Sequence, residues 1–299
     1  MPEQAPQVAV VGHVEWVQFG RVEHLPRPGE VAHASEAFEE PAGGGAVAAV
    51  ALARLAGGCD LHTVLGEDEE ARRTVKRLTE LGVRVLNGPA AFQEGTAAGP
   101  PPTRRAVTLI DAAGERTITT FGPRMDPAGE QSPGDPVRWS ELDGLDASYF
   151  TAGDVAALRR AREGSRVLVA SPRARRALGH GVALDALVLS ADDQVELAAA
   201  RPALAEAELV LYTEGARGGR WRRRDGTEGR WAAVPPPGPI VDSYGAGDTF
   251  AAALTYGLGA HLSLEQALTV AARSGAEVLT WAGPYGRGQT RRRRESPQT

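Results

Sequence analysis

The sequence predicts an α/β fold in which a mainly parallel sheet lies between two layers of helices. Short apolar segments alternate with helix-forming segments along most of the chain. The predicted strands are apolar on both faces, which is typical of parallel strands that helices cover on each side. The Gly-rich loops fall at strand ends, where sheets of this type bind ligands. We therefore expect a three-layer α/β/α domain with its site at that edge.

The predicted elements follow one another along the chain in the order that such a fold requires. The expected strands are residues 7–11, 61–65, 83–86, 147–151, 167–170, 187–190 and 209–213. The expected helices are residues 45–56, 68–81, 155–162, 192–201, 249–257 and 264–280. At 299 residues the chain is long enough for one large α/β domain or two modest ones, and we expect one domain over 1–299.

Two segments depart from this alternation and predict a second, smaller sheet. Residues 30–39 and 106–121 are polar and alternating, and the second contains Asp111-Ala112-Ala113-Gly114, a hairpin signal. We expect small-sheet strands near residues 13–40 and 103–122. The alternative is that these segments are edge strands of the main sheet. Exposed edges are normally covered or paired, which favours the separate sheet.

Composition excludes several classes of protein. The formal charge of −5 gives no general attraction to nucleic acid or to an anionic membrane. No apolar run is long enough to span a bilayer, and the first residues lack a signal-peptide pattern, so we expect a cytoplasmic protein. Cys59 is the only cysteine and is expected to be buried. The basic tail, residues 287–299 with Arg291 to Arg294, is expected to be disordered.

The use of lysine excludes two routes of phosphoryl transfer. Lys76 is the only lysine, and it lies in a helical pattern with no glycine before it. This excludes a Walker P-loop, and it also excludes the strand lysine of protein kinases. A phosphotransferase with this sequence would have to neutralise phosphate charge with backbone amides, arginine and a metal ion.

Residues 240–252 carry the most specific functional pattern. The apolar pair Ile240-Val241 is followed by the turn Gly245-Ala246-Gly247, and a helix-forming segment begins with Asp248 in its first turn. Glycines allow close approach to the backbone, and the free amides at a helix start favour phosphate oxygens. Asp248 would lie beside such an anion. The alternative is an ordinary Gly-rich loop with Asp248 as a helix cap.

The segment from Asp242 to Phe250 resembles the C-terminal signature of the ribokinase-like, or PfkB, family of carbohydrate kinases. Further similar strings extend the resemblance over about residues 7–286: 10–12, 25–30, 43–46, 51–55, 63–68, 114–118 and 213–219. The resemblance implies an ATP-dependent kinase in which Asp248 is the general base and the amides of Gly245, Ala246 and Gly247 stabilise the transferred phosphoryl group. It also implies that the small sheet is a lid that can pair with its copy in a homodimer.

The resemblance assigns residues to the nucleotide and its ions. Thr213, Gly215 and Gly218 match a loop that contacts ATP, and Arg217 within it could offset phosphate charge. Asp242, with residues 279–286, matches the region that holds a monovalent cation such as K⁺ in many members, although Asp242 could equally cap the turn. Ser190 and Asp193 replace the family's Asn-x-x-Glu pattern, which contacts Mg²⁺ through water. A helix start, with Ser190 as cap, would explain this pair equally well.

The acceptor side departs from the family's sugar kinases. His13, Glu15, Gly43 and Gly44 are the expected substrate contacts. Val17 and Val47, however, stand where those kinases have an aspartate and an asparagine, so two partners of sugar hydroxyls are missing. Gln18 is a further polar candidate.

These substitutions keep three functions open. The first is a kinase of a sugar or sugar-like alcohol, and the second is a nucleoside kinase of the same fold. The third is a non-catalytic protein that senses a ligand, although a sensor would not require the complete segment from Gly245 to Asp248.

Overall fold

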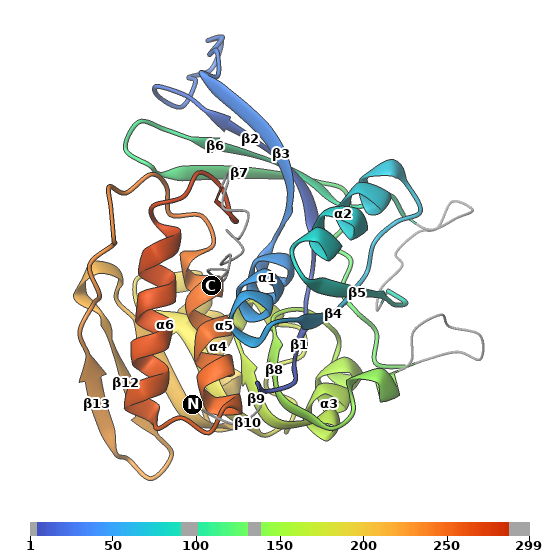
Figure 1. Ribbon diagram of the computed structural model, residues 1–299, viewed down its shortest axis with the longest axis vertical. Helices are drawn as coiled ribbons and strands as arrows, with labels where there is room; N and C mark the ends of the chain where they lie inside the picture. Colours follow the sequence, from blue (N-terminus) through green and yellow to red (C-terminus); the bar gives the residue numbers. More distant parts are fainter. Residues whose placement is uncertain (1–4, 91–100, 131–138, 287–299) are drawn as a thin grey trace, which may run out of the picture.

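The computed structural model describes residues 5–90, 101–130 and 139–286, and it shows a three-layer α/β/α arrangement (Figure 1). The main sheet of the described residues has nine strands in the order β13-β12-β11-β10-β9-β8-β1-β4-β5. All its pairs from β11 to β5 are parallel, and only β12 and β13 run antiparallel to their neighbours. The predicted fold class is therefore confirmed.

The strands of the main sheet are close to the predicted ones. They are β1 (Val8–Val11), β4 (Cys59–Thr63), β5 (Val83–Asn87), β8 (Leu145–Phe150), β9 (Ser165–Ala170), β10 (Leu184–Ser190), β11 (Ala207–Thr213), β12 (Gly219–Arg223) and β13 (Glu228–Trp231). The hairpin of β12 and β13 is an addition that the sequence analysis did not identify. Cys59 is buried at the start of β4, as expected.

Helices cover both faces of this sheet, because successive strand residues point to opposite sides. The helices are α1 (Gly44–Ala56), α2 (Glu69–Glu80), α3 (Val155–Gly164), α4 (Gln194–Ala200), α5 (Ala246–Gly259) and α6 (Leu264–Val278). Val8 and Val10 of β1 pack in one apolar core with α1, α2, α5 and α6. Ala9 and Val11 pack in a second core with α3 and α4. The two cores are the two interfaces of the three layers.

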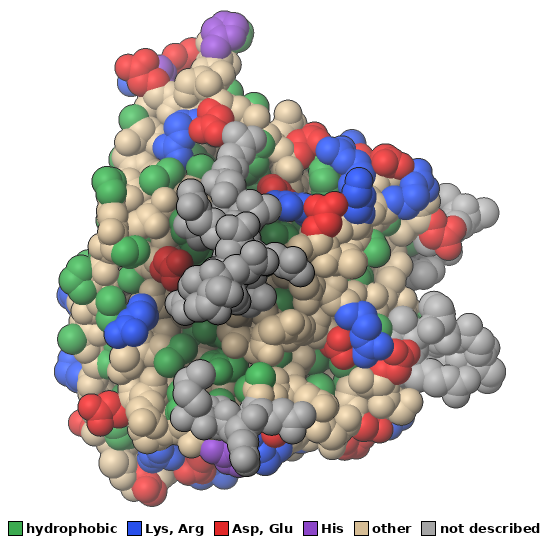
Figure 2. All heavy atoms as spheres, in the orientation of Figure 1, with side chains coloured by type: hydrophobic (Ala, Val, Ile, Leu, Met, Phe, Trp, Pro, Cys, Tyr) green, Lys and Arg blue, Asp and Glu red, His purple; other side chains and the backbone are tan. Residues whose placement is uncertain are grey.

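Local signals set the helix boundaries. Asp68 caps α2 by accepting a hydrogen bond from the amide of Ala71, and Ser263 forms a capping box with Gln266 at the start of α6. The exposed face of α2 is covered by mixed acidic and basic side chains (Figure 2). One of them, Arg77, forms a bidentate ion pair with Glu40 and so ties α2 to the neighbouring small sheet.

The small sheet has the strand order β3-β2-β6-β7 and is separate from the main sheet (Figure 1). Its strands are β2 (Glu15–Arg21), β3 (Glu36–Ala42), β6 (Arg105–Ile110) and β7 (Arg116–Phe121). The predicted hairpin is confirmed, and the alternative of extra edge strands in the main sheet is wrong. The strand expected over 30–39 is corrected: it begins only at Glu36, because its sheet partner β2 ends at Arg21.

Within the described residues, no helix is both long and apolar enough to cross a membrane. The predicted disordered tail, residues 287–299, lies outside the described residues.

The end of β1 and the start of α1 approach so closely that Gly12 has no room for a side chain. A Cβ atom there would lie 2.5 Å from Thr151 Cγ2 and 2.7 Å from Gly45 Cα. We predict that Gly12→Ala lowers the free energy of unfolding by about 1–3 kcal/mol, because the backbone must shift. Gly58→Ala is the control, since its nearest neighbour would be 3.9 Å away. Equal denaturant midpoints for the two variants would contradict this prediction.

Candidate active site

The start of α5 places a carboxylate beside a Gly-rich turn. Gly245 precedes the helix with a φ of 79°, a left-handed conformation that favours glycine, and no side chain caps the helix there. Asp248 lies in the first turn with 7% of its surface exposed. The alternative of Asp248 as a helix cap is therefore wrong. A Cβ atom on Gly247 would meet nothing within 4 Å, so the backbone there is open to approach.

Asp248 faces a guanidinium that comes from another strand end. Arg173 follows β9, and its Nε lies 3.6 Å from Asp248 Oδ1. The nearby negative charge of Asp248 raises the pKa of Arg173. A Cβ atom on Gly44 would lie 3.0 Å from the same oxygen of Asp248, so glycine at this position gives the carboxylate its room.

A pocket of about 250 Å³ opens in front of this pair. The predicted substrate residues His13, Glu15, Gly43 and Gly44 all line it, together with Tyr244, Gly245 and Asp248. The rest of the lining comes from the small sheet and the strand ends: Arg104, Arg116, Ile118, Thr120, Arg124 and Arg173. The structure thus brings the acceptor-side candidates and Asp248 into one cavity that the small sheet adjoins.

Burial sets the charges of the two polar residues near β2. It lowers the pKa of His13 well below 6.5, and Arg124, Arg173 and Arg104 act in the same direction, so His13 is neutral. Burial also raises the pKa of Glu15, while the guanidinium of Arg104 opposes this shift. The Nε of Arg104 and Oε1 of Glu15 are 3.1 Å apart.

Val17 and Val47 do not line this pocket. Both are buried in the apolar cluster beneath the small sheet, where Val17 is 0% and Val47 is 2% exposed. Gln18 points to the opposite face of β2 and is exposed. The two valines therefore pack the small sheet against the rest of the protein, and the lining of the pocket is polar and rich in arginine.

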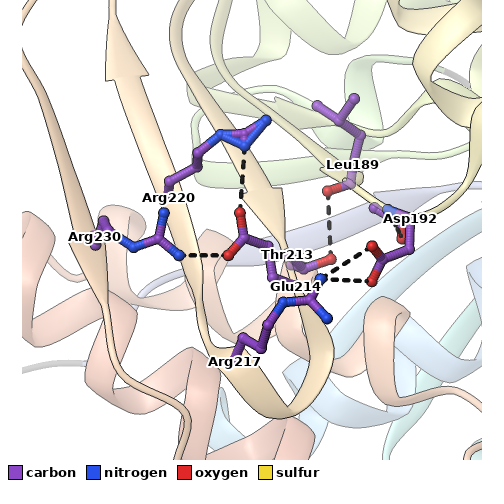
Figure 3. A network of polar contacts seen from close by, with 8 residues as sticks. Leu189, Asp192, Thr213, Glu214, Arg217, Arg220 and Arg230 are labelled. Carbon is purple, nitrogen blue, oxygen red and sulfur yellow. Dashed lines mark hydrogen bonds and ion pairs between the residues drawn. The ribbon is translucent and has the colours of Figure 1, made fainter.

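The predicted nucleotide loop follows β11 and is held by its own ion pairs (Figure 3). Glu214 lies between Arg220 and Arg230, with distances of 3.3 Å and 2.5 Å. Arg217 extends to the carboxylate of Asp192, 3.0 Å away. The hydroxyl of Thr213 donates to the carbonyl of Leu189. Gly215 and Gly218 both have positive φ, which accounts for glycine at these positions.

The two residues assigned to magnesium begin α4. Asp193 is the helix cap and accepts hydrogen bonds from the amides of Val195 and Glu196, so the cap is Asp193 and not Ser190. The amide of Ser190 donates to Glu196 Oε2 at 2.9 Å, and the other oxygen of Glu196 lies 3.9 Å from Arg173. The described residues hold no group of three potential metal-ligating side chains. Glu196 is thus a carboxylate near Arg173 that the sequence analysis missed.

Asp242 joins the loop before α5 to the loop after α6. Its side chain is fully buried and accepts hydrogen bonds from the amides of Tyr244, at 2.9 Å, and Gly283, at 2.8 Å. Burial raises its pKa. The structure therefore shows the turn-capping role that the sequence left open, and the monovalent cation stays a prediction.

The fold of this chain is similar to that of solved ribokinases. The ribokinase of Thermotoga maritima has 20% sequence identity and a TM-score of 0.71, with 94% of this chain and 95% of that chain covered. The ribokinase of Arabidopsis thaliana, solved with ribose and ATP, has 20% identity and a TM-score of 0.68, with 94% of each chain covered. Identities this low establish the fold alone.

The C-terminal part of the chain also matches a family by sequence. Residues 183–289 match the family described as pfkB family carbohydrate kinase. The chain is also similar to the acarbose 7(IV)-phosphotransferase of an Actinoplanes species, with 45% identity over 75 residues. That match spans 25% of this chain and 25% of the relative's length. The resemblance to the PfkB family indicated by the motifs is thereby confirmed.

The neutral, buried His13 predicts a pH dependence of stability. The unfolded chain binds a proton at His13 below pH 6.5, but the folded chain does not, so stability falls as pH falls. Between about pH 7.5 and about pH 5.5, the wild type should lose about 1.4 kcal/mol more unfolding free energy than His13→Gln. Denaturant unfolding at both pH values measures this. The exposed His180 supplies the control variant His180→Gln, and identical losses in all three proteins would contradict the prediction.

Proposed function

We propose that this protein transfers the γ-phosphate of ATP to a hydroxyl of a sugar or sugar-like acceptor. The observation that carries the proposal is the position of Asp248 at the start of α5, facing a pocket that Gly44 and Gly245 also line. An acceptor hydroxyl in this pocket would lie within reach of the carboxylate. The family match and the shared fold support the same reaction class.

Asp248 would accept the proton of the acceptor hydroxyl as the bond to phosphorus forms. Phosphoryl transfer has a loose transition state, so the proton can leave late and positioning dominates. The amides of Gly245, Ala246 and Gly247 lie at the positive end of a 14-residue helix, and they would stabilise charge on the transferred group. Arg173 holds the carboxylate in place and offsets its charge in a partly desolvated pocket.

The nucleotide would lie along the loop that contains Thr213, Gly215 and Gly218, with Arg217 at its edge. Mg²⁺ bound to ATP would neutralise phosphate charge, and the carboxylates of Asp193 and Glu196 suit water-mediated contact with it. Asp242 and residues 279–286 remain the proposed region for a monovalent cation such as K⁺.

We also propose that the small sheet acts as a lid over the acceptor, since Arg104, Ile118 and Thr120 line the pocket from it. The edge strand β7 is exposed along its whole length, including Ile118 and Phe121. An exposed apolar edge favours pairing with a second copy, which is the predicted homodimer.

The nucleoside kinase alternative receives no support from the pocket lining. It depended on Val17 and Val47 making the acceptor site less polar, but both valines are buried away from that lining.

The proposal predicts that Asp248→Asn abolishes turnover but not nucleotide binding. The rate should fall by about 10²–10⁴-fold, because the isosteric amide cannot accept the proton. ADP formation with a panel of sugars, sugar derivatives and nucleosides measures turnover, and calorimetry measures ATP affinity. Asp225→Asn, in the exposed β12–β13 turn, is the control. A near-normal rate in Asp248→Asn would show that Asp248 is not the base.

A further inference from the structure

A second cavity, of about 220 Å³, adjoins the acceptor pocket and is lined almost entirely by charged side chains. Its charged lining is Arg104, Arg124, Asp126, Arg173, Arg175 and Arg176. Three of these, Arg104, Arg124 and Arg173, also line the pocket in front of Asp248. The two cavities therefore share a wall of guanidinium groups.

The charges of the combined lining do not balance. Six arginines line the two cavities: Arg104, Arg116, Arg124, Arg173, Arg175 and Arg176. The carboxylates in the same lining are Glu15, Asp126 and Asp248. His13 adds no further positive charge near neutral pH, because burial lowers its pKa well below 6.5. Glu196 lies 3.9 Å from Arg173 and is a further carboxylate nearby. Even when it is counted, the arginines outnumber the carboxylates.

The pairing of individual groups shows where the excess lies. Arg104 faces Glu15, Arg124 donates to Asp126 at 2.7 Å, and Arg173 faces Asp248. Arg116, in contrast, contacts the neutral Ser243 and the ring of Tyr244. Among the described residues, neither Arg116 nor Arg175 forms an ion pair with a carboxylate. Arg116 lines the pocket in front of Asp248 and Arg175 lines the second cavity, so each cavity has one guanidinium without a carboxylate partner among the described residues.

The place of this cavity in the sheet separates it from the predicted nucleotide loop. Gly153 and Arg173 to Arg176 follow β8 and β9, whereas Thr213 ends β11, two strands further along the sheet. Arginine forks bind phosphate and carboxylate oxygens in bidentate fashion, and they contribute most where solvent is partly excluded. The cavity therefore suits an anion on the acceptor, in addition to the phosphates of ATP.

We propose that the acceptor is an anionic sugar derivative, with a phosphate or a carboxylate that binds between Arg104, Arg124 and Arg175 while a hydroxyl lies at Asp248. This inference rests on the proposed kinase function. The inference also explains why the pocket can bind a polar acceptor with valine at positions 17 and 47. Contacts between the arginines and the anionic group would replace the hydroxyl contacts that aspartate and asparagine make in the family's sugar kinases.

The test compares matched acceptors with ATP and Mg²⁺: ribose against ribose 5-phosphate, and glucose against glucose 6-phosphate and gluconate. We expect at least one anionic member to raise the melting temperature and to be phosphorylated with kcat/KM about 10-fold or more above its neutral partner. Comparing the two sugar phosphates with gluconate shows whether the cavity binds a phosphate or a carboxylate. A preference for the neutral sugars throughout would overturn the inference and leave the kinase function intact.

Arg175→Gln tests the cavity itself, because Arg175 is exposed and its loss leaves no buried carboxylate without a partner. It should raise KM for the anionic acceptor by about 10- to 100-fold and reduce the preference over the neutral sugar, with ADP affinity unchanged. Arg159→Gln on the exposed face of α3 is the matched control and should change neither. Weakened ADP binding in Arg175→Gln would mean that the cavity holds nucleotide phosphate, which overturns the inference. If Arg175→Gln abolished anion binding but no anion were phosphorylated, the cavity would be an anion site that serves no acceptor, which would overturn the inference.

Discussion

The site depends on one constraint. The carboxylate of Asp248, almost fully buried at the start of α5, needs a positively charged partner and neighbours small enough not to clash with it. Arg173 supplies the charge, 3.6 Å away. Gly44 leaves space for the carboxylate, since a Cβ there would lie 3.0 Å from Asp248 Oδ1. Gly245 lets the turn before α5 pack on α1, since a Cβ there would lie 2.8 Å from Val47. Burying a charge without such a partner is costly. The start of α1, the turn before α5 and the end of β9 are therefore fixed relative to one another by this contact.

The small sheet is held over the same site by apolar contacts. Phe19 stacks on Phe38 and meets the ring of Tyr244 edge-on, and Val17 and Val47 fill the space beneath. Tyr244 belongs to the turn before Asp248, and its hydroxyl accepts a hydrogen bond from the amide of Gly43. The packing that closes the small sheet thus also orients the Gly-rich turn. Polar side chains at the two valine positions would disrupt this cluster, because they would be buried without partners.

The sequence predicts most of this architecture because its signals are local. Apolar runs identify the parallel strands, the hairpin turn identifies β6 and β7, and the segment at Gly245 to Asp248 identifies the start of α5 with its open turn. The arginines were missed because Arg104, Arg124 and Arg173 are far apart in the chain and arginine is frequent throughout it. A usable signal existed for Arg173, which lies in the loop just after the carboxyl end of a predicted strand. Glu196 was missed because it lies in the first turn of α4, beyond the predicted motif that ends at Asp193, and its approach to Arg173 depends on how that helix is placed.

The two halves of the site differ in how their arginines are neutralised, and this difference has a chemical consequence. In the loop proposed to hold the nucleotide, Arg217 pairs with Asp192, while Arg220 and Arg230 share Glu214 (Figure 3). These guanidiniums are satisfied within the protein, so ATP would rely on backbone amides and its metal ion. On the proposed acceptor side, Arg116 and Arg175 line the cavities without a carboxylate partner among the described residues. A neutral acceptor would leave that positive charge uncompensated beside a second substrate that is itself highly charged. An anionic acceptor would neutralise this positive charge. Because Arg173 lines both cavities and also contacts Asp248, such an acceptor would be held in a fixed position relative to Asp248.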